Sequence, residues 1–207
     1  MNMAENGKNK LSADFDRFAI GVLMNDIISL GKEKFAEGNR REAAVLFRKV
    51  AEPDSTWGWM FAEAQYKLGK LYEIGTEEGN DLAESAKWYR KAAENGHAGA
   101  QFMLGRYYSC GVGVEKNYVE AIAWYRKAAE QGHPYAHERL ARCYVRGAGV
   151  ERNLEEAEKL LKKAVASAKG ETDKACLQTR YDSFVEMVLQ GDGDSAYLWY
   201  RGQCSRE

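Results

Sequence analysis

The sequence contains little cysteine and little histidine. Its 207 residues include only 4 cysteines and 3 histidines. Four cysteines at no fixed period are too few for a disulfide framework in a chain of this length. We therefore expect reduced thiols at Cys110, Cys143, Cys176 and Cys204.

An excess of charge of either sign is also missing. The 30 basic residues are balanced by 31 acidic ones, which gives a formal net charge of -1. Such a chain has no global field for gripping nucleic acid or an anionic membrane, and we predict neither partner. Because 45% of the residues are hydrophobic, the chain can bury a substantial core, and we expect a compact soluble protein rather than a disordered one.

No long hydrophobic run is present. The apolar stretch 18–30 is interrupted by Asn25 and Asp26, so it is neither the hydrophobic region of a signal peptide nor a membrane span. We therefore expect no membrane insertion and, by default, a cytoplasmic location. A periplasmic or secreted protein whose signal peptide has been removed would show the same sequence.

Signals of catalysis and of metal binding are weak. The chain has no Gly-x-Ser-x-Gly turn for a nucleophilic serine. His133 and His137 have the four-residue spacing that can place two imidazoles on one helical face, but Pro134 lies between them and no Cys-x-x-Cys pair accompanies them. We predict no enzymatic activity, no metal site and no cofactor.

A repeat with a period of 36 residues dominates what the sequence does contain. Leu68, Leu104 and Leu140 occupy equivalent places in three copies of one block, and Trp88 and Trp124 recur in its second half. Within a copy, an apolar helical pattern ends at glycines and a second helix follows, beginning near Asn117 in the second copy. Each copy is therefore predicted to be a helical hairpin whose tryptophan is core, and neighbouring hairpins stack because none can bury its apolar face alone.

The second copy carries Leu104-Gly, Gly111-Val-Gly-Val, Trp124-Tyr and Ala128-Ala. This combination resembles the Sel-one-like repeat family, a relative of the tetratricopeptide repeats. The resemblance implies an all-α fold, an α/α superhelix or solenoid of stacked antiparallel helical hairpins, and a role in binding other proteins. The first copy lacks the Gly-x-Gly-Val loop and the third replaces Trp-Tyr by Leu160-Leu.

The repeats suggest a division of the chain. We predict a disordered tail at 1–16, a helical repeat solenoid at 17–169 and capping helices at 170–207. The apolar face of the last segment belongs either to a capping hairpin or to a docking helix for a partner. The solenoid would comprise a tetratricopeptide-like hairpin at 22–53 and Sel-one-like repeats at 62–97, 98–133 and 134–169.

The predicted binding site is a column of cations. In tetratricopeptide-type hairpins the first helix lines a concave groove, and the residue after each Leu-Gly or Leu-Ala pair is basic in every copy. Tyr66 and Phe102 stand four residues before two of these cations and would supply apolar anchors. The candidate groove residues are Lys32, Lys70, Arg106 and Arg142, with Tyr66 and Phe102.

This column favours an acidic protein or peptide as the partner, because lysine and arginine engage carboxylates. The predicted function is a non-catalytic protein-protein interaction adaptor or scaffold. Two alternatives stay open: a β-lactam hydrolase-like or metal-dependent enzyme on the same fold, and a purely structural spacer in a larger assembly. The cations are equally compatible with an ordinary solvated helix face.

Overall fold

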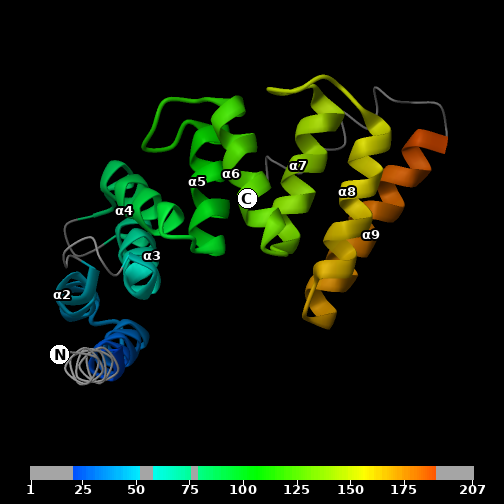
Figure 1. Cartoon of the computed structure of the whole chain (residues 1–207). Helices are drawn as coiled ribbons and strands as arrows, with labels where there is room; N and C mark the ends of the chain where they lie inside the picture. The colour runs from blue at the N-terminus through cyan, green and yellow to red at the C-terminus, as the bar shows by residue number, and fades with distance from the viewer. Residues whose placement is uncertain (1–20, 52–57, 76–78, 190–207) are drawn as a thin grey trace, which may run out of the picture. The chain divides into compact units, whose positions relative to one another are not determined.

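The structure is a computed structural model that describes residues 21–51, 58–75 and 79–189. The regular elements of these ranges are α-helices, as the repeat pattern predicts (Figure 1). The predicted tail at 1–16 lies outside the described residues, as does the second part of the predicted C-terminal caps, 190–207. No helix in the described ranges is long and apolar enough to cross a membrane.

The chain divides into two compact units, Met1–Asn95 and Gly96–Glu207, called here the first and the second unit. The first unit contains a helix over residues 21–36, then α2 (Arg40–Ala51), α3 (Gly58–Ile74) and α4 (Leu82–Glu94). The second contains α5 (Ala98–Cys110), α6 (Tyr118–Glu130), α7 (Pro134–Arg146), α8 (Leu154–Ser167) and α9 (Glu171–Leu189). Within each unit, helices that are consecutive in sequence pack against each other.

Each hairpin turns in the way the sequence predicts. Gly111 ends α5 with φ 74°, in the left-handed region that favours glycine, and Asn117 caps α6 by accepting from the backbone N–H groups of Val119 and Glu120. The loop is closed by the backbone N–H of Asn117, which donates to the carbonyl of Tyr108 at 2.9 Å. The other two repeats make the same bond, Asp81 to Tyr72 and Asn153 to Tyr144, so the first repeat keeps this closure despite its different loop.

Close contact between paired helices depends on a small residue facing a large one. A Cβ on Gly69 would lie 2.6 Å from the ring of Tyr89, and a Cβ on Gly105 would lie 2.6 Å from the ring of Tyr125. In the third repeat both members differ, since the equivalent positions hold Ala141 and the shorter Leu161. Alignment of the copies places a small residue at this position in each repeat, and its partner lies 20 residues later in the same copy.

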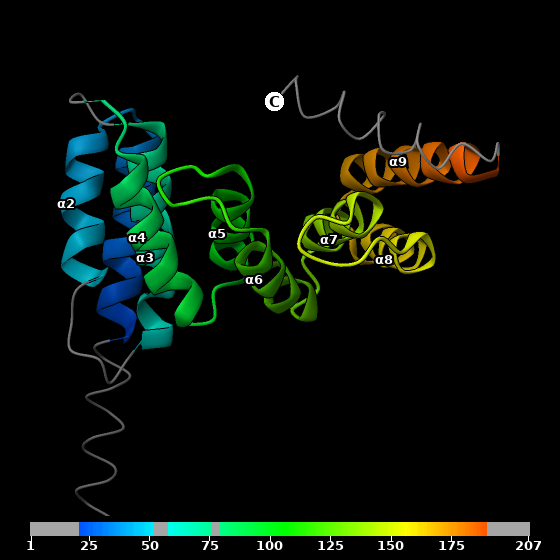
Figure 2. The same ribbon diagram turned by 90° about the horizontal axis from the view of Figure 1, so that it is seen from above.

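Both repeat tryptophans are core residues, as predicted. Trp88 is 3% exposed and packs in the first unit with Phe47, Leu68 and Leu71, while Trp124 is 7% exposed in the second. The hydrophobic core of the second unit continues into α9, where Leu177 and Phe184 are buried. In Figures 1 and 2, α9 lies alongside α8, so this helix covers the end of the last repeat.

Candidate functional site

In the first unit, two of the predicted groove cations line one hollow. Lys32, on the helix over residues 21–36, and Lys70, on α3, lie around a cavity of about 220 Å³ together with Lys67. Phe35 and Phe47 complete its lining. Lys67 was not part of the predicted column, although it stands three residues before Lys70 on the same helix. A basic rim over an aromatic floor suits an acidic chain that carries an apolar side chain.

Lys32 and Lys67 share a single carboxylate, that of Glu63. Lys32 Nζ lies 3.1 Å from Glu63 Oε1, and Lys67 Nζ lies 3.5 Å from the same oxygen. The side chains of Lys32 and Glu63 are 50% and 38% exposed, so these ion pairs are worth little in water. Because the pairs are weak, a carboxylate from outside can replace Glu63 at low cost.

Tyr66 belongs more to the packing of the first unit than to an open surface. The centroids of the Tyr66 and Tyr89 rings lie 5.7 Å apart, and Lys67 Nζ lies 5.6 Å from the centroid of the Tyr66 ring. Burial raises the pKa of the phenol above its ordinary value. The ring therefore holds Lys67 beside the hollow, while its anchoring role remains a prediction.

In the second unit, Phe102 lies inside an aromatic cluster. Its ring stacks on His133 at 4.5 Å between centroids and contacts Tyr125 and Tyr135 at 5.9 and 6.5 Å. Arg106, one turn further along α5, is half-buried, and its Nη1 donates to Met103 Sδ at 3.7 Å. Both residues are thus partly engaged within the fold.

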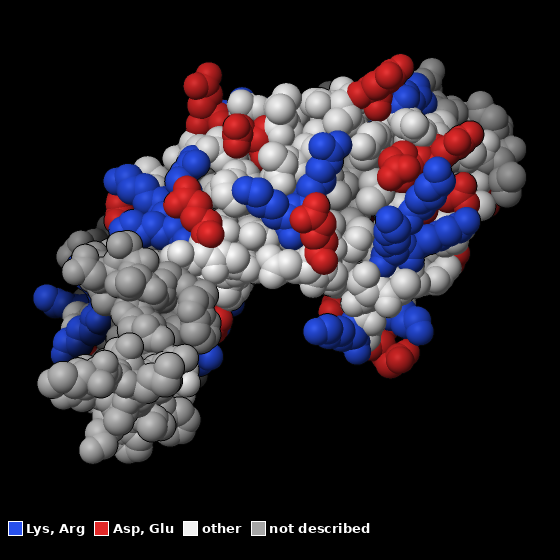
Figure 3. Space-filling model, in the orientation of Figure 1, with Lys and Arg blue, Asp and Glu red and all other residues white. Residues whose placement is uncertain are grey.

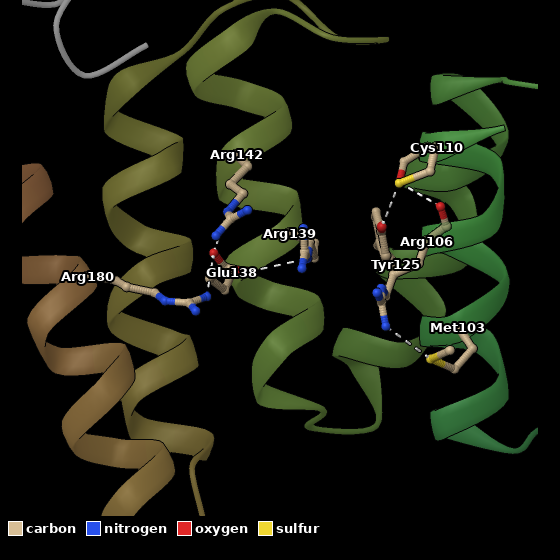
Figure 4. Close-up of polar contacts among 9 residues, drawn as sticks. Met103, Arg106, Cys110, Tyr125, Glu138, Arg139, Arg142 and Arg180 are labelled. Atoms are coloured by element: carbon tan, nitrogen blue, oxygen red, sulfur yellow. Dashed lines mark hydrogen bonds and ion pairs between the residues drawn. The ribbon is translucent and has the colours of Figure 1, made fainter. Parts of the chain in front are cut away.

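Arg142 differs from the expectation that every cation of the column is exposed. Its side chain is buried, and its Nε donates to Glu138 Oε1 at 2.5 Å (Figure 4). Arg180, on α9, reaches the same oxygen at 3.2 Å, and Tyr135 donates to Asp173 at the start of α9. The expectation of exposure was wrong because α9 covers this face of α7, and α9 has no repeat signature from which its position follows.

A second basic cavity, of about 320 Å³, lies in the second unit. Arg139, Arg142 and Arg146 line it from α7, and Lys116 lines it from the loop before α6. Arg139 and Arg142 are the third-repeat equivalents of Lys67 and Lys70, so the same helix positions line both cavities. Sequence reasoning missed Arg139 and Arg146, although their spacing from Arg142 of three and four residues places all three on one helical face.

The histidines have structural surroundings. His97 caps α5, where its Nδ1 accepts from the backbone N–H of Ala100 at 3.1 Å. Burial, with a smaller effect of nearby histidines, lowers the pKa of His133, and burial also lowers the pKa of His137. Among the described residues, no group of three or more His, Cys, Asp or Glu side chains is arranged to hold a metal ion.

One short sequence match relates to the enzymatic alternative. Ser29-Leu-Gly-Lys32 has the Ser-x-x-Lys spacing of serine β-lactamases, but the accompanying Ser-Asp-Asn and Lys-Thr-Gly motifs do not occur in the sequence. Ser29 is exposed on its helix, and Lys32 is paired with Glu63. The match therefore adds no support for hydrolysis.

Comparison with protein families identifies the repeats. The sequence model of the Sel1 repeat matches residues 62–97, 98–133 and 134–168, which together make up more than half of the chain. The chain belongs to the Sel1 repeat family. Sel1 repeat proteins form helical solenoids and typically act as non-catalytic scaffolds that bind other proteins.

Solved Sel1 repeat structures resemble this chain. A Sel1 repeat protein from Oxalobacter formigenes is 32% identical, with a TM-score of 0.60 over 69% of this chain and 56% of its own. The protein c5321, a protective antigen of uropathogenic Escherichia coli strains, is 27% identical, with a TM-score of 0.64 over 93% of this chain and 48% of its own. This chain thus spans about half the length of these relatives. A comparison with curated proteins gives no match.

Proposed function

We propose that this Sel1 repeat chain is a non-catalytic adaptor that binds an acidic segment of a partner protein along the first helices of its hairpins. The observation that carries the proposal is the hollow of about 220 Å³ in the first unit, where Lys32, Lys67 and Lys70 surround an aromatic floor. The proposal is also supported by the typical role of Sel1 repeat proteins as protein-interaction scaffolds.

The charges in the hollow favour an acidic partner. Three lysines line the hollow, and two of them, Lys32 and Lys67, pair with Glu63 in the partly exposed ion pairs described above. The half-buried Phe35 gives an apolar side chain of the partner a surface to contact, and binding energy concentrates at such contacts. On the face shown in Figure 3, acidic and basic side chains are interspersed. Tyr66, Phe102 and Arg106, each half-buried, remain proposed contact residues within their own units, whereas Arg142 is buried and is not part of the proposed surface.

Selection of peptides from an unbiased displayed library tests this function. We expect the wild type to enrich acidic peptides that contain an aromatic or aliphatic residue, and the variant K32E/K70E to bind the enriched peptides at least tenfold more weakly. The matched control is R41E/K49E, which makes the same charge change at exposed residues that do not line the hollow. Both variants are first compared with the wild type by thermal unfolding.

Failure of the proposal has a clear form. If the enriched peptides bind K32E/K70E as tightly as the wild type, the hollow is not the binding site. If no peptide is enriched and a larger assembly tolerates K32E/K70E, the chain acts as a spacer rather than as an adaptor.

A further inference from the structure

The cavity of about 320 Å³ in the second unit is built from four basic side chains and a set of hydroxyl and thiol groups. Its basic wall is Lys116, Arg139, Arg142 and Arg146. The remaining lining comes from α5, α6, α7 and the loop after α7, and comprises Ser109, Cys110, Tyr118, Tyr125, Cys143 and Ala148. Tyr125 lies 3.1 Å from Ser109, hydroxyl to hydroxyl, at the side that faces the arginines.

Behind this wall, three guanidinium groups converge on one carboxylate. Glu138 has no exposed surface, and its oxygens lie 2.5 Å from Arg142, 3.2 Å from Arg180 and 3.7 Å from Arg139. Arg142 and Arg180 point at Glu138 from α7 and α9, whereas Arg139 lies on the side of α5 and α6 (Figure 4). These ion pairs fix the positions of the arginine side chains, and Arg139 and Arg142 also line the cavity.

The cavity is open to solvent at Arg139, Lys116 and Cys110, whose side chains are at least partly exposed. The side chain of Arg139 is 19% exposed, compared with 6% for Arg142, and Lys116 and Cys110 are exposed. A guanidinium is a planar donor that matches the two oxygens of a carboxylate, and it keeps its charge at every physiological pH. Arg139 is thus more accessible than Arg142, and Arg146 lies on the same helical face.

We propose that this cavity binds the carboxylate of an aspartate or glutamate side chain in an acidic peptide. Arg142 already donates a hydrogen bond to the carboxylate of Glu138 within the fold. The cavity volume accommodates an acidic side chain with part of its backbone. Insofar as the peptide belongs to a partner protein, the inference rests on the proposed function, but the site lies in the other unit and uses different residues.

Cys110 supplies a reporter for the test. It is an exposed free thiol that lines the cavity, and Cys176, also exposed and free, lies on α9 outside the cavity lining. The rate of iodoacetamide alkylation at each cysteine is measured by peptide mass spectrometry. The probes are the capped peptide of four glutamates, the capped peptide of four glutamines, and inorganic phosphate, each at constant ionic strength.

We expect the glutamate peptide to slow alkylation of Cys110 at least fivefold in a saturable manner and to leave Cys176 unchanged. In R139Q/R146Q this protection should disappear. The matched control K159Q/K162Q removes two positive charges from exposed positions on α8 and should keep the protection. Arg142 is left intact because its removal would strand the buried Glu138.

Three results would each overturn the proposal. One is equal protection by the glutamine peptide, which the wild type alone reveals even if R139Q/R146Q fails to fold. Another is full protection in a folded R139Q/R146Q. The third is protection by phosphate without protection by the glutamate peptide, which would make the cavity a phosphate site.

A parallel measurement on K32E/K70E separates this inference from the proposed function. Protection of Cys110 should persist there, because neither lysine lines this cavity. If K32E/K70E loses the library peptides while the glutamate peptide fails to protect Cys110 in the wild type, the function stands and the cavity assignment falls.

Discussion

At the scale of single residues, two glycines each lie close against a tyrosine ring of the same hairpin. Gly69 and Gly105 are helical glycines whose role is to let a tyrosine ring lie against the backbone, not to adopt an unusual conformation. A methyl group at either position would overlap the ring, and the ring has little room to move because Tyr89 and Tyr125 are fully buried.

Gly105→Ala should therefore lower the free energy of unfolding by about 1–3 kcal/mol, the usual cost of overpacking a core. Chemical denaturation of the purified protein measures this difference. Shortening the partner in the double variant G105A/Y125L reproduces the Ala141 and Leu161 pair of the third repeat. The double variant should then lose less unfolding free energy than the sum of the losses in the two single variants. A loss larger than that sum would contradict this account.

Trp124→Ala removes a nearly buried aromatic side chain that Lys127 covers, with Nζ 4.0 Å from the ring centroid. The expected cost is about 3–5 kcal/mol of unfolding free energy. A melting temperature equal to that of the wild type would show that the ring is not core.

Cysteine reactivity follows from burial. Burial raises the pKa of the Cys143 thiol to about 11, although the nearby arginines oppose the shift, and the thiolate is the reactive form. At pH 8 we expect alkylation of Cys110 and Cys176 to be much faster than that of Cys143, as measured for each cysteine by mass spectrometry. The difference should vanish in denaturant, and rapid labelling of Cys143 in the folded protein would contradict the structure.

At the scale of elements, the start of α7 is expected to make the stability of the second unit depend on pH. His133 and His137 both have folded-state pKa values below the ordinary value, because burial disfavours the charged imidazole. Below about pH 6.5 the unfolded chain therefore binds more protons than the folded one, and stability falls as the pH drops. Above that pH this contribution is fully present.

We accordingly expect the melting temperature to fall between pH 7 and pH 5, with a smaller fall for H133Q/H137Q. H97N keeps a side-chain acceptor at the start of α5 and is measured alongside as the control variant. An unchanged slope in H133Q/H137Q would assign the acid sensitivity to other groups.

The helix α9 is the other element that sets the properties of the second unit. Phe184 is fully buried against the last repeat, while Val188, one turn later, is 37% exposed. Phe184→Ala should lower the unfolding free energy by about 3–5 kcal/mol, and Val188→Ala should change it by less than about 0.5 kcal/mol. Similar losses in both variants, measured by denaturant titration, would mean that α9 does not pack as described.

At the scale of the whole molecule, the packing is mostly local along the chain, since consecutive helices supply most of the contacts within each unit. In such a repeat protein, destabilisation spreads mainly to neighbours. Hydrogen exchange should show that Gly69→Ala reduces protection most in the first unit, whereas Gly105→Ala reduces it most in the second. Uniform loss of protection in both variants would indicate that the chain unfolds as one cooperative body.

Sequence alone predicted the helical hairpins because their determinants recur. The glycine after α5, the asparagine cap of α6 and the buried tryptophans are all repeat positions, so comparison of the copies reveals them. The burial of Arg142 was missed because it depends on α9, which lies outside the repeats. Arg139 and Arg146 were missed for the opposite reason: their equivalents in the second repeat are Met103 and Cys110, so comparison of copies hides a cluster that one copy alone possesses.

The pairing of a small residue with a large one 20 positions later also limits how such a gene can change. Gly105 and Tyr125, or Ala141 and Leu161, fit within their own copy, but a crossover inside a hairpin would set the methyl group of Ala141 against the ring of Tyr125. Duplication or exchange of whole copies keeps each pair together. Viable recombination points are therefore expected between hairpins rather than within them, which is also where insertions designed to lengthen the array should be placed.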